Sequence, residues 1–234
     1  MAGIFPTGHI LFEEIADDLA AHRDDLDAYA RALASLNRSA RLTGPRNPDV
    51  IWNEHILDCA FSLPFAPEIG RAVDVGSGGG LPGIVWAVCR PHLTVVLVES
   101  VRKKCSALKE ITSLLGLENV IVECARSEQL AAVSRESFTI AVSRAVGHLG
   151  VVAEYLSPLV APGGRLLCFK GPKVRDEIGE IGAQWGLLGL KEPVLRPYSH
   201  GGKDLYLALW EKSGHCPDRF PRRPGMAQKQ PWWR

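Results

Sequence analysis

The sequence predicts an α/β fold: a mostly parallel seven-stranded sheet that ends in a C-terminal β-hairpin and follows an N-terminal helical extension. Three observations lead to this prediction. From Arg71 onward, short apolar runs alternate with amphipathic stretches, which is typical of parallel strands buried on both faces. A glycine-rich stretch follows the first apolar run directly. Two further runs near the C-terminus flank a short glycine-containing gap, as in a hairpin.

The residues before this alternation predict a helical cap, residues 1–70. Within residues 10–36, apolar side chains recur at three-, four- and seven-residue spacings, which predicts helical structure with a packing face. Residues 41–50 are rich in turn formers and predict a loop. Residues 52–65 predict a second helix, which ends at Pro64 or Pro67.

The sheet domain is predicted over residues 71–212. Its expected strands are residues 72–75, 94–99, 119–124, 138–145, 165–170, 190–197 and 204–211. Its expected helices are residues 81–89, 102–117, 148–160 and 173–186. The Pro162-Gly163-Gly164 stretch is expected to end the third of these helices. The remaining residues, 213–234, are rich in proline and arginine and predict an extended basic tail.

The composition is that of an ordinary globular protein. Of 234 residues, 46% are hydrophobic and 23% are charged, and no apolar run or N-terminal layout indicates a membrane span or a signal peptide. The six cysteines form no C-x-x-C pair and most lie in apolar segments, so we expect reduced core thiols rather than disulfides or a zinc site. These features favour a cytoplasmic protein, which we take to be a monomer without a metal.

The net charge of +1 argues against nucleic-acid binding through the overall charge of the protein, so any such binding must come from local clusters of basic residues. Residues 218–234 carry five cations and one acid, and their candidates for RNA contact are Arg222, Arg223 and Lys229. The neighbouring Trp232 and Trp233 either stack on bases or belong to a merely soluble tail. Lys103 and Lys104 lie at the start of a predicted helix, where they either contact RNA phosphates or simply form a solvated helix end.

Two ligand motifs overlap in the glycine-rich stretch. Residues 78–83 fit the G-x-G-x-x-G fingerprint of dinucleotide sites, whereas residues 74–80 fit the D-x-G-x-G-x-G turn of S-adenosylmethionine sites. Glu99 ends the next apolar run, 23 residues after Gly76, where an acid can accept hydrogen bonds from ribose hydroxyls. A nucleoside site is therefore predicted, but either cofactor would fit it.

Further features favour S-adenosylmethionine. Asp74 precedes the glycines and either holds the cationic amino acid end of that cofactor or caps the turn. Leu81 and the proline after it crowd the helix start that a pyrophosphate would need. The chain has no obvious second domain for a hydride acceptor. Ser127-Glu128 follows the third strand, where it either borders adenine or caps a helix.

A set of segments then resembles a known family. In order, RLTG, WNEHILD, DVGSGGGLPG, VESVRKKCSALKEI, ARSEQL, VSRAVGHL, FKG and FPRRPGMAQK are similar to the glucose-inhibited division protein B family, and they extend from about Leu42 to Lys229. The resemblance implies a Rossmann-like class I methyltransferase fold with S-adenosylmethionine as cofactor. It implies methylation of a guanine N7 in 16S rRNA, in a loop near the decoding site.

The resemblance also implies roles for individual residues. Those that it implies bind the cofactor are Gly76, Leu81, Glu99, Ser127, Glu128 and Arg144, and Asp74 and Gly78 of the glycine-rich stretch complete the expected set. Arg144 would face the cofactor or the target base. His55 and Asp58 match a recurrent pair; because they share one helical face, we expect structural support of the pocket rather than catalysis.

The chemistry requires few catalytic groups. Guanine N7 has a lone pair and no proton to lose, so alignment can supply most of the rate without a general base. Arg144 and Lys170 are the predicted donors that orient the base, although Lys170 can also be read as a solvated residue at a strand end. Two other functions stay open: an NAD(P)-dependent oxidoreductase and a non-catalytic rRNA-binding assembly factor.

Overall fold

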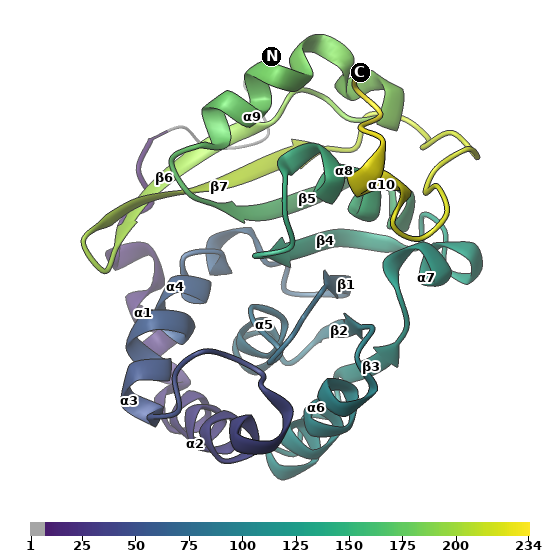
Figure 1. The fold of residues 1–234 in the computed structure, drawn as a ribbon. Helices are drawn as coiled ribbons and strands as arrows, with labels where there is room; N and C mark the ends of the chain where they lie inside the picture. The colour runs from purple at the N-terminus through teal and green to yellow at the C-terminus, as the bar shows by residue number, and fades with distance from the viewer. Residues whose placement is uncertain (1–7) are drawn as a thin grey trace. The chain divides into compact units, whose positions relative to one another are not determined.

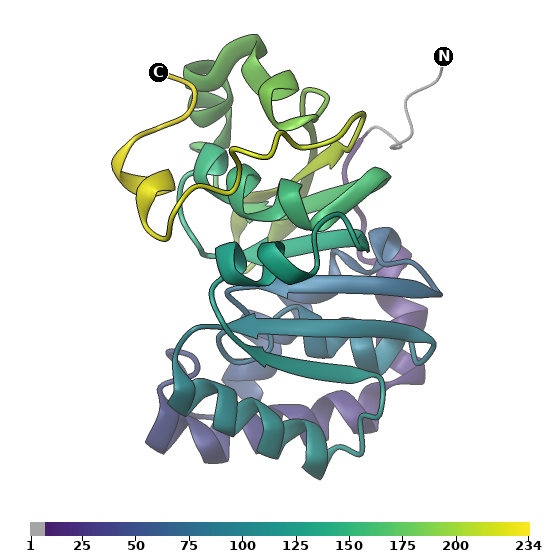
Figure 2. The ribbon, with the colours of Figure 1, turned by 90° about the vertical axis from the view of Figure 1, so that its right-hand side faces the viewer.

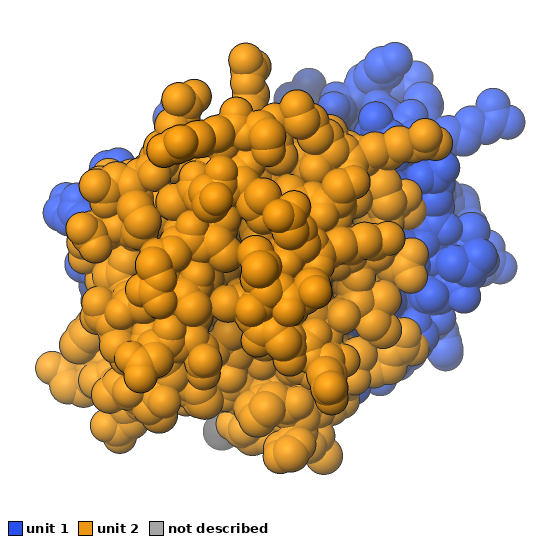
Figure 3. Space-filling model, turned by 90° about the horizontal axis from the view of Figure 1, so that it is seen from below, with its two compact units in different colours: residues 1–9, 126–234 blue, residues 10–125 orange. Residues whose placement is uncertain are grey.

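The computed structural model describes residues 8–234, and they form two compact units (Figure 3). The first unit along the chain comprises residues 10–125 and is labelled unit 2 in Figure 3. The second comprises residues 126–234 together with residues 8–9 and is labelled unit 1 there. The strand order is β3-β2-β1-β4-β5-β7-β6. The predicted α/β fold, with seven strands and a C-terminal hairpin, is thereby confirmed. The predicted division into a cap (1–70), a sheet domain (71–212) and a tail (213–234) remains a proposal.

The first unit begins with helices, whose bounds are α1 (Glu13–Ala21), α2 (Arg23–Ala40), α3 (Pro48–Ile51), a π-helix (Trp52–Ile56), α4 (Leu57–Ala60) and a 3-10 turn (Leu63–Phe65). The helical structure predicted over residues 10–36 is confirmed from Glu13 onward, but it is divided into two helices, because the backbone leaves the helical region at His22 (φ −115°, ψ 20°). Neither glycine nor proline marks this break. The buried Arg90 holds α1 through two hydrogen bonds to Asp18, of 2.7 and 2.9 Å.

The loop after α2 is shorter than predicted, because α3 already begins at Pro48. Asn47 caps this helix: its side chain accepts hydrogen bonds from the amides of Asp49 and Val50. The regular helix predicted over residues 52–65 is wrong in detail, since a π-helical turn and a 3-10 turn flank only four α-helical residues. These changes of helix type turn the side chains relative to one another in a way that sequence spacing does not reveal.

Three parallel strands complete this unit: β1 (Gly70–Val75), β2 (Leu93–Glu99) and β3 (Val120–Cys124). Figures 1 and 2 show them side by side, with β2 in the middle. Helix α5 (Gly83–Cys89) follows β1, and α6 (Arg102–Leu114) follows β2. Parallel strands end at the same edge, so the residues that follow β1 and β2 are neighbours.

The second unit contains the other four strands, β4 (Phe138–Arg144), β5 (Val160–Lys170), β6 (Val194–His200) and β7 (Lys203–Glu211). Strands β4 and β5 are parallel, and β7 runs antiparallel between β5 and β6. The hairpin turns at Gly201 (φ 57°) and Gly202 (φ 71°), and two positive φ angles in succession suit a tight two-residue turn. The helices are α7 (Ser127–Val133), α8 (Leu149–Leu156), α9 (Val174–Ile181) and α10 (Met226–Lys229), with 3-10 turns at Ser157–Leu159 and Gly182–Leu188.

The prediction that Pro162-Gly163-Gly164 ends the helix before it is wrong. Helix α8 ends at Leu156, and these three residues lie inside β5. There the pairing with β4 jumps from Phe138↔Val160 to Ile140↔Arg165, so the segment between bulges out of the ladder. Gly163 has a φ of 86°, a conformation that glycine adopts without strain.

Residues 213–234, here called the C-terminal segment, are not the extended tail that the composition predicts. The segment includes α10, and its Trp232 and Trp233 are buried. Trp232 Nε1 donates a hydrogen bond to the carbonyl of Gly150 (2.8 Å), and Trp233 stacks on His148 with 4.8 Å between the ring centroids. The tryptophans serve as packing groups because the N-terminal end of α8 offers them a surface, which composition cannot show.

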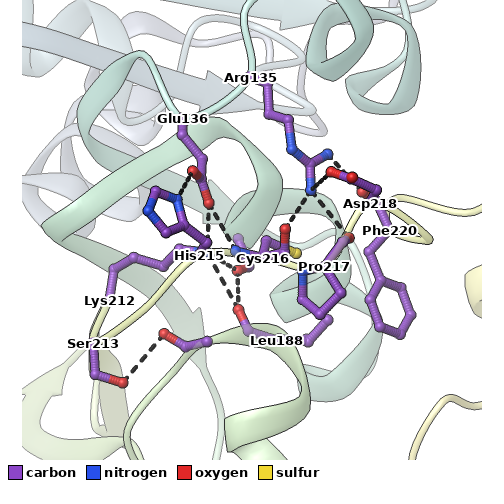
Figure 4. A network of polar contacts seen from close by, with 12 residues as sticks. Arg135, Glu136, Leu188, Lys212, Ser213, His215, Cys216, Pro217, Asp218 and Phe220 are labelled. Atoms are coloured by element: carbon purple, nitrogen blue, oxygen red, sulfur yellow. Dashed lines mark hydrogen bonds and ion pairs between the residues drawn. The ribbon is translucent and has the colours of Figure 1, made fainter.

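A polar network fixes the start of this segment (Figure 4). Arg135 donates to the carbonyls of Cys216, Pro217 and Phe220. Glu136 accepts hydrogen bonds from the Cys216 amide (2.7 Å) and the His215 ring (2.6 Å). The fully buried Lys212 lies 3.5 Å from Glu136, so charged groups surround the point where the segment leaves β7.

The cysteines confirm the expected free thiols. Five of them are buried, Cys124 is exposed, and none of the six is in a disulfide. Burial raises the pKa of Cys89 and of Cys168 to about 12, which keeps both thiols protonated and unreactive. Among residues 8–234, no helix is long and apolar enough to cross a membrane.

Candidate active site

The glycine-rich turn joins β1 to α5. Gly76, Gly78 and Gly80 all have positive φ, of 74°, 56° and 94°. Residues other than glycine rarely adopt a backbone conformation with positive φ. At Gly80 a Cβ atom would also collide with the side chain of Ile84. Gly76 lies outside the dinucleotide fingerprint and shares the special conformation, as the D-x-G-x-G-x-G reading requires.

Asp74 lies fully buried under this turn. Its Oδ2 accepts a hydrogen bond from the amide of Gly83 (2.9 Å), the first residue of α5. The capping alternative is therefore present in the structure, and a role for Asp74 toward the amino acid end of a cofactor stays a prediction. The carboxylate has a further consequence: it places negative charge at the helix N-terminus, where a dinucleotide would need to bind its pyrophosphate.

Glu99 ends β2 beside the turn and is 7% exposed. Its Oε2 accepts from the amide of Gly78 (3.2 Å) and its Oε1 from the amide of Val101 (2.8 Å). A carboxylate offers about four acceptor positions, so two remain for the hydroxyls of a ribose. The residues present thus fit the nucleoside of S-adenosylmethionine. Tyr29, which the sequence reading missed, supports the turn by donating to the carbonyl of Gly79 (2.8 Å).

We expect Glu99→Gln to weaken the binding of S-adenosylhomocysteine by about 10- to 150-fold, the effect of losing a hydrogen bond to a charged group worth about 1.5–3 kcal/mol. Isothermal titration calorimetry measures this affinity. The exposed Glu110 on α6 supplies the matched control, Glu110→Gln, which should bind like the wild type. Equal affinities for both variants would exclude Glu99 from the cofactor site.

The other predicted cofactor residues belong to the second unit. Ser127 is buried at the first position of α7, and its hydroxyl donates to Glu128 Oε2 (3.2 Å). The side-chain cap of this helix comes from Gln129, whose Oε1 accepts a hydrogen bond from the Arg126 amide (2.9 Å), so the cap alternative for Ser127-Glu128 is not what the structure shows. Arg144 is half-buried and ends β4. Adenine contact by Ser127 and Glu128 stays a prediction, as does the role of Arg144. Leu81, in the first unit, is buried next to α5.

A pocket of about 550 Å³ opens where β4 and β5 end, lined among others by Ala145, Gly147, Phe169 and Lys170. Lys170 is not the solvated strand-end residue of the alternative reading, because its side chain is only 10% exposed. Its Nζ lies 2.6 Å from Glu177 Oε2 and donates to the carbonyl of Gly147 (2.9 Å). Sequence reasoning did not single out Glu177, which becomes a neighbour of Lys170 only through the packing of α9.

The residues predicted to contact RNA differ in their exposure to solvent and in their partners within the protein. Lys103, Arg223 and Lys229 are exposed, and Lys104 is half-buried. Arg222 instead binds the buried Glu154 through Nε (3.0 Å) and Nη2 (2.6 Å). Its guanidinium is thus engaged within the protein, so Arg222 is a weaker candidate for RNA than its neighbour.

His55 lies in the π-helix and Asp58 in α4, where Asp58 is buried. Because a π-helical turn precedes Asp58, the regular three-residue spacing assumed from the sequence does not apply. Supporting roles for both residues stay predictions. In residues 8–234, no group of three or more His, Cys, Asp or Glu side chains could hold a metal ion.

The fold and the glycine turn beside Glu99 define the class of this protein: a Rossmann-like fold of the class I S-adenosylmethionine-dependent methyltransferases. A model of the GidB family, described as rRNA small subunit methyltransferase G, matches residues 22–202. The chain belongs to this family.

Curated relatives named ribosomal RNA small subunit methyltransferase G cover most of the chain. The protein of Rubrobacter xylanophilus is 40% identical over 88% of this chain and 82% of its own length. That of Sorangium cellulosum is 36% identical, over 90% and 92%. Among solved structures, a mutant of MtNAS has a TM-score of 0.53 at 16% identity, covering 88% of this chain and 83% of that one. At this identity the likeness concerns the fold alone.

Proposed function

We propose that this protein transfers a methyl group from S-adenosylmethionine to N7 of a guanine in 16S rRNA, in a loop near the decoding site. The observation that carries the proposal is the family match over residues 22–202. The positive φ angles of Gly76 and Gly78 in the turn beside Glu99 agree with it. The cofactor supplies the electrophilic methyl group. The oxidoreductase alternative loses support because Asp74 occupies the start of α5 with a negative charge.

In this proposal the pocket at the ends of β4 and β5 receives the guanine. Lys170 donates a hydrogen bond to O6, and Arg144 at the end of β4 is the second donor. Methylation at N7 leaves a positive charge on the base, and the electron pair of the broken carbon–sulfur bond stays on the sulfur of the cofactor. No side chain needs to remove a proton, so the protein contributes mainly by alignment.

The exposed cations Lys103, Arg223 and Lys229 are proposed to contact RNA phosphates. The same proposal takes the protein to be a cytoplasmic monomer that acts on 16S rRNA or on the small ribosomal subunit.

The test is methyl transfer from labelled S-adenosylmethionine to small subunits from a strain that lacks this protein. We expect one labelled nucleotide, recovered as 7-methylguanosine. Binding of the subunit without transfer would instead support an assembly factor. Thermal stabilisation by NADH but not by S-adenosylhomocysteine would support the oxidoreductase.

A further inference from the structure

One carboxylate ties together the two segments that line the pocket at the ends of β4 and β5. Oε2 of Glu177 accepts a hydrogen bond from the amide of Leu149 (2.5 Å), the first residue of α8. The same oxygen lies 2.6 Å from Nζ of Lys170, the last residue of β5. Nζ in turn donates to the carbonyl of Gly147 (2.9 Å), which closes a ring of contacts between the β4–α8 loop, the end of β5 and α9.

This ring restricts the ammonium group of Lys170. The ammonium has three N–H donors, of which Glu177 and the carbonyl of Gly147 engage two. Among residues 8–234, the third donor has no acceptor, and Lys170 lines the pocket. Two fixed bonds leave a tetrahedral group little freedom to rotate, so the direction of the third N–H is set by its partners.

Burial strengthens the restriction. The side chain of Lys170 is 10% exposed and that of Glu177 is 17% exposed, so water competes little for either charge. The pair also lets the pocket hold an ammonium group without an unpaired buried charge. The β4–α8 loop needs such a tie, because Ala145 has a φ of 60° and Gly147 a φ of 141° in its course.

We propose that Glu177 is a positioning residue: it holds the Lys170 ammonium so that its remaining N–H points at an acceptor on the target base. This inference rests on the proposed function, in which Lys170 touches guanine O6. Glu177 itself acts through Lys170, whose Nζ it holds together with the carbonyl of Gly147. Loss of its charge should therefore slow the aligned reaction rather than weaken capture of the RNA, which exposed cations elsewhere provide.

The test compares Glu177→Gln, Lys170→Met and the double variant in the methyl-transfer assay, with the melting temperature and the affinity for S-adenosylhomocysteine measured alongside. We expect Glu177→Gln to lower kcat by about 10- to 100-fold, as for a group misplaced by about an ångström, without a matching rise in KM for the RNA. The double variant should be no slower than Lys170→Met alone, because Glu177 acts through that lysine. Asp176→Asn is the matched control: it removes an exposed carboxylate from the same turn of α9 and should keep the wild-type rate.

The other outcomes contradict either the positioning role of Glu177 or the proposed function. If the wild type transfers methyl groups to guanine N7 and Glu177→Gln matches its kcat, or if the two single losses multiply in the double variant, the positioning role is wrong and the proposed function stands. If the wild type yields no 7-methylguanosine, the proposed function fails, and the inference fails with it. Should Glu177→Gln not fold, Glu177→Asp keeps the charge but withdraws it by one methylene, and the same comparison applies.

Discussion

Replacing Arg222 with alanine is expected to destabilise the protein by about 3–5 kcal/mol, the usual cost of breaking a buried ion pair. Glu154, in the middle of α8, is 1% exposed. It accepts hydrogen bonds from the Arg222 amide and from two guanidinium nitrogens of that residue. Without Arg222 the Glu154 carboxylate would stay buried with its charge uncompensated. At about 2–4 °C per kcal/mol for a protein of this size, thermal unfolding measures the loss directly.

The chain supplies a matched control at the next position. Arg223 is exposed, and Arg223→Ala should change stability by less than about 0.5 kcal/mol, as surface substitutions usually do. Arg222→Leu combined with Glu154→Leu should recover part of the lost stability, because it removes both charges together. The assignment of Arg222 as a structural residue would be abandoned if both arginine variants melted like the wild type while RNA binding weakened only in Arg222→Ala.

A second large effect is expected at Glu136, where Glu136→Gln should cost about 3 kcal/mol or more at neutral pH. The substitution removes the carboxylate that faces the fully buried Lys212 at 3.5 Å. Lys212 would keep the hydroxyl of Ser157 and the carbonyl of Leu188 as acceptors but lose its counter-charge. Burial already lowers the pKa of Lys212, so the cost of its charge rises further in the variant.

The same residue predicts a dependence of stability on pH. Burial alone would raise the pKa of Glu136, but the bonds from His215 and the Cys216 amide, and the charge of Lys212, bring it below its ordinary value of 4.5. The unfolded chain therefore binds the proton more tightly than the folded one. The contribution of Glu136 is fully present above that value and is lost as the pH falls through the lower pKa of the folded state.

Urea unfolding at a series of pH values measures both effects. The stability difference between the wild type and Glu136→Gln should shrink as the pH drops below 4.5. The control is Glu211→Gln, which breaks an ion pair with Lys191, itself more than half exposed, and should cost about 1 kcal/mol or less. A difference that stayed constant down to acidic pH would show that the charge of Glu136 is not what stabilises the network in Figure 4.

The strands and their order of appearance were predictable because parallel strands carry continuous apolar runs. AVDV and TVVLVE correspond to the ends of β1 and β2, and the glycine-containing gap before β7 forms the expected hairpin turn. The helices were less predictable. The apolar spacing continues across His22 although the helix does not, and the start of β5 is hidden because a bulge places Pro162 and Gly163 inside the strand.

The candidate site divides in the same way. The glycine turn and Glu99 are local features, each set by its place at the end of a strand, so sequence spacing was enough to bring them together. Tyr29 reaches the glycine turn from 50 residues away through the packing of α2, and Glu177 reaches the amide of Leu149 from 28 residues away through the packing of α9. The periodicity of a helix indicates which residues share a face, but not which other element that face meets.

The sequence by itself determined the class of fold, the glycine turn and the family to which the chain belongs. Only the tertiary structure decided that the basic C-terminal segment is packed, with Arg222 bound to Glu154 and both tryptophans buried. The physical reason is that charge and apolar area are properties of single residues, whereas a partner for a charge and a surface for a ring exist only after distant elements have packed together.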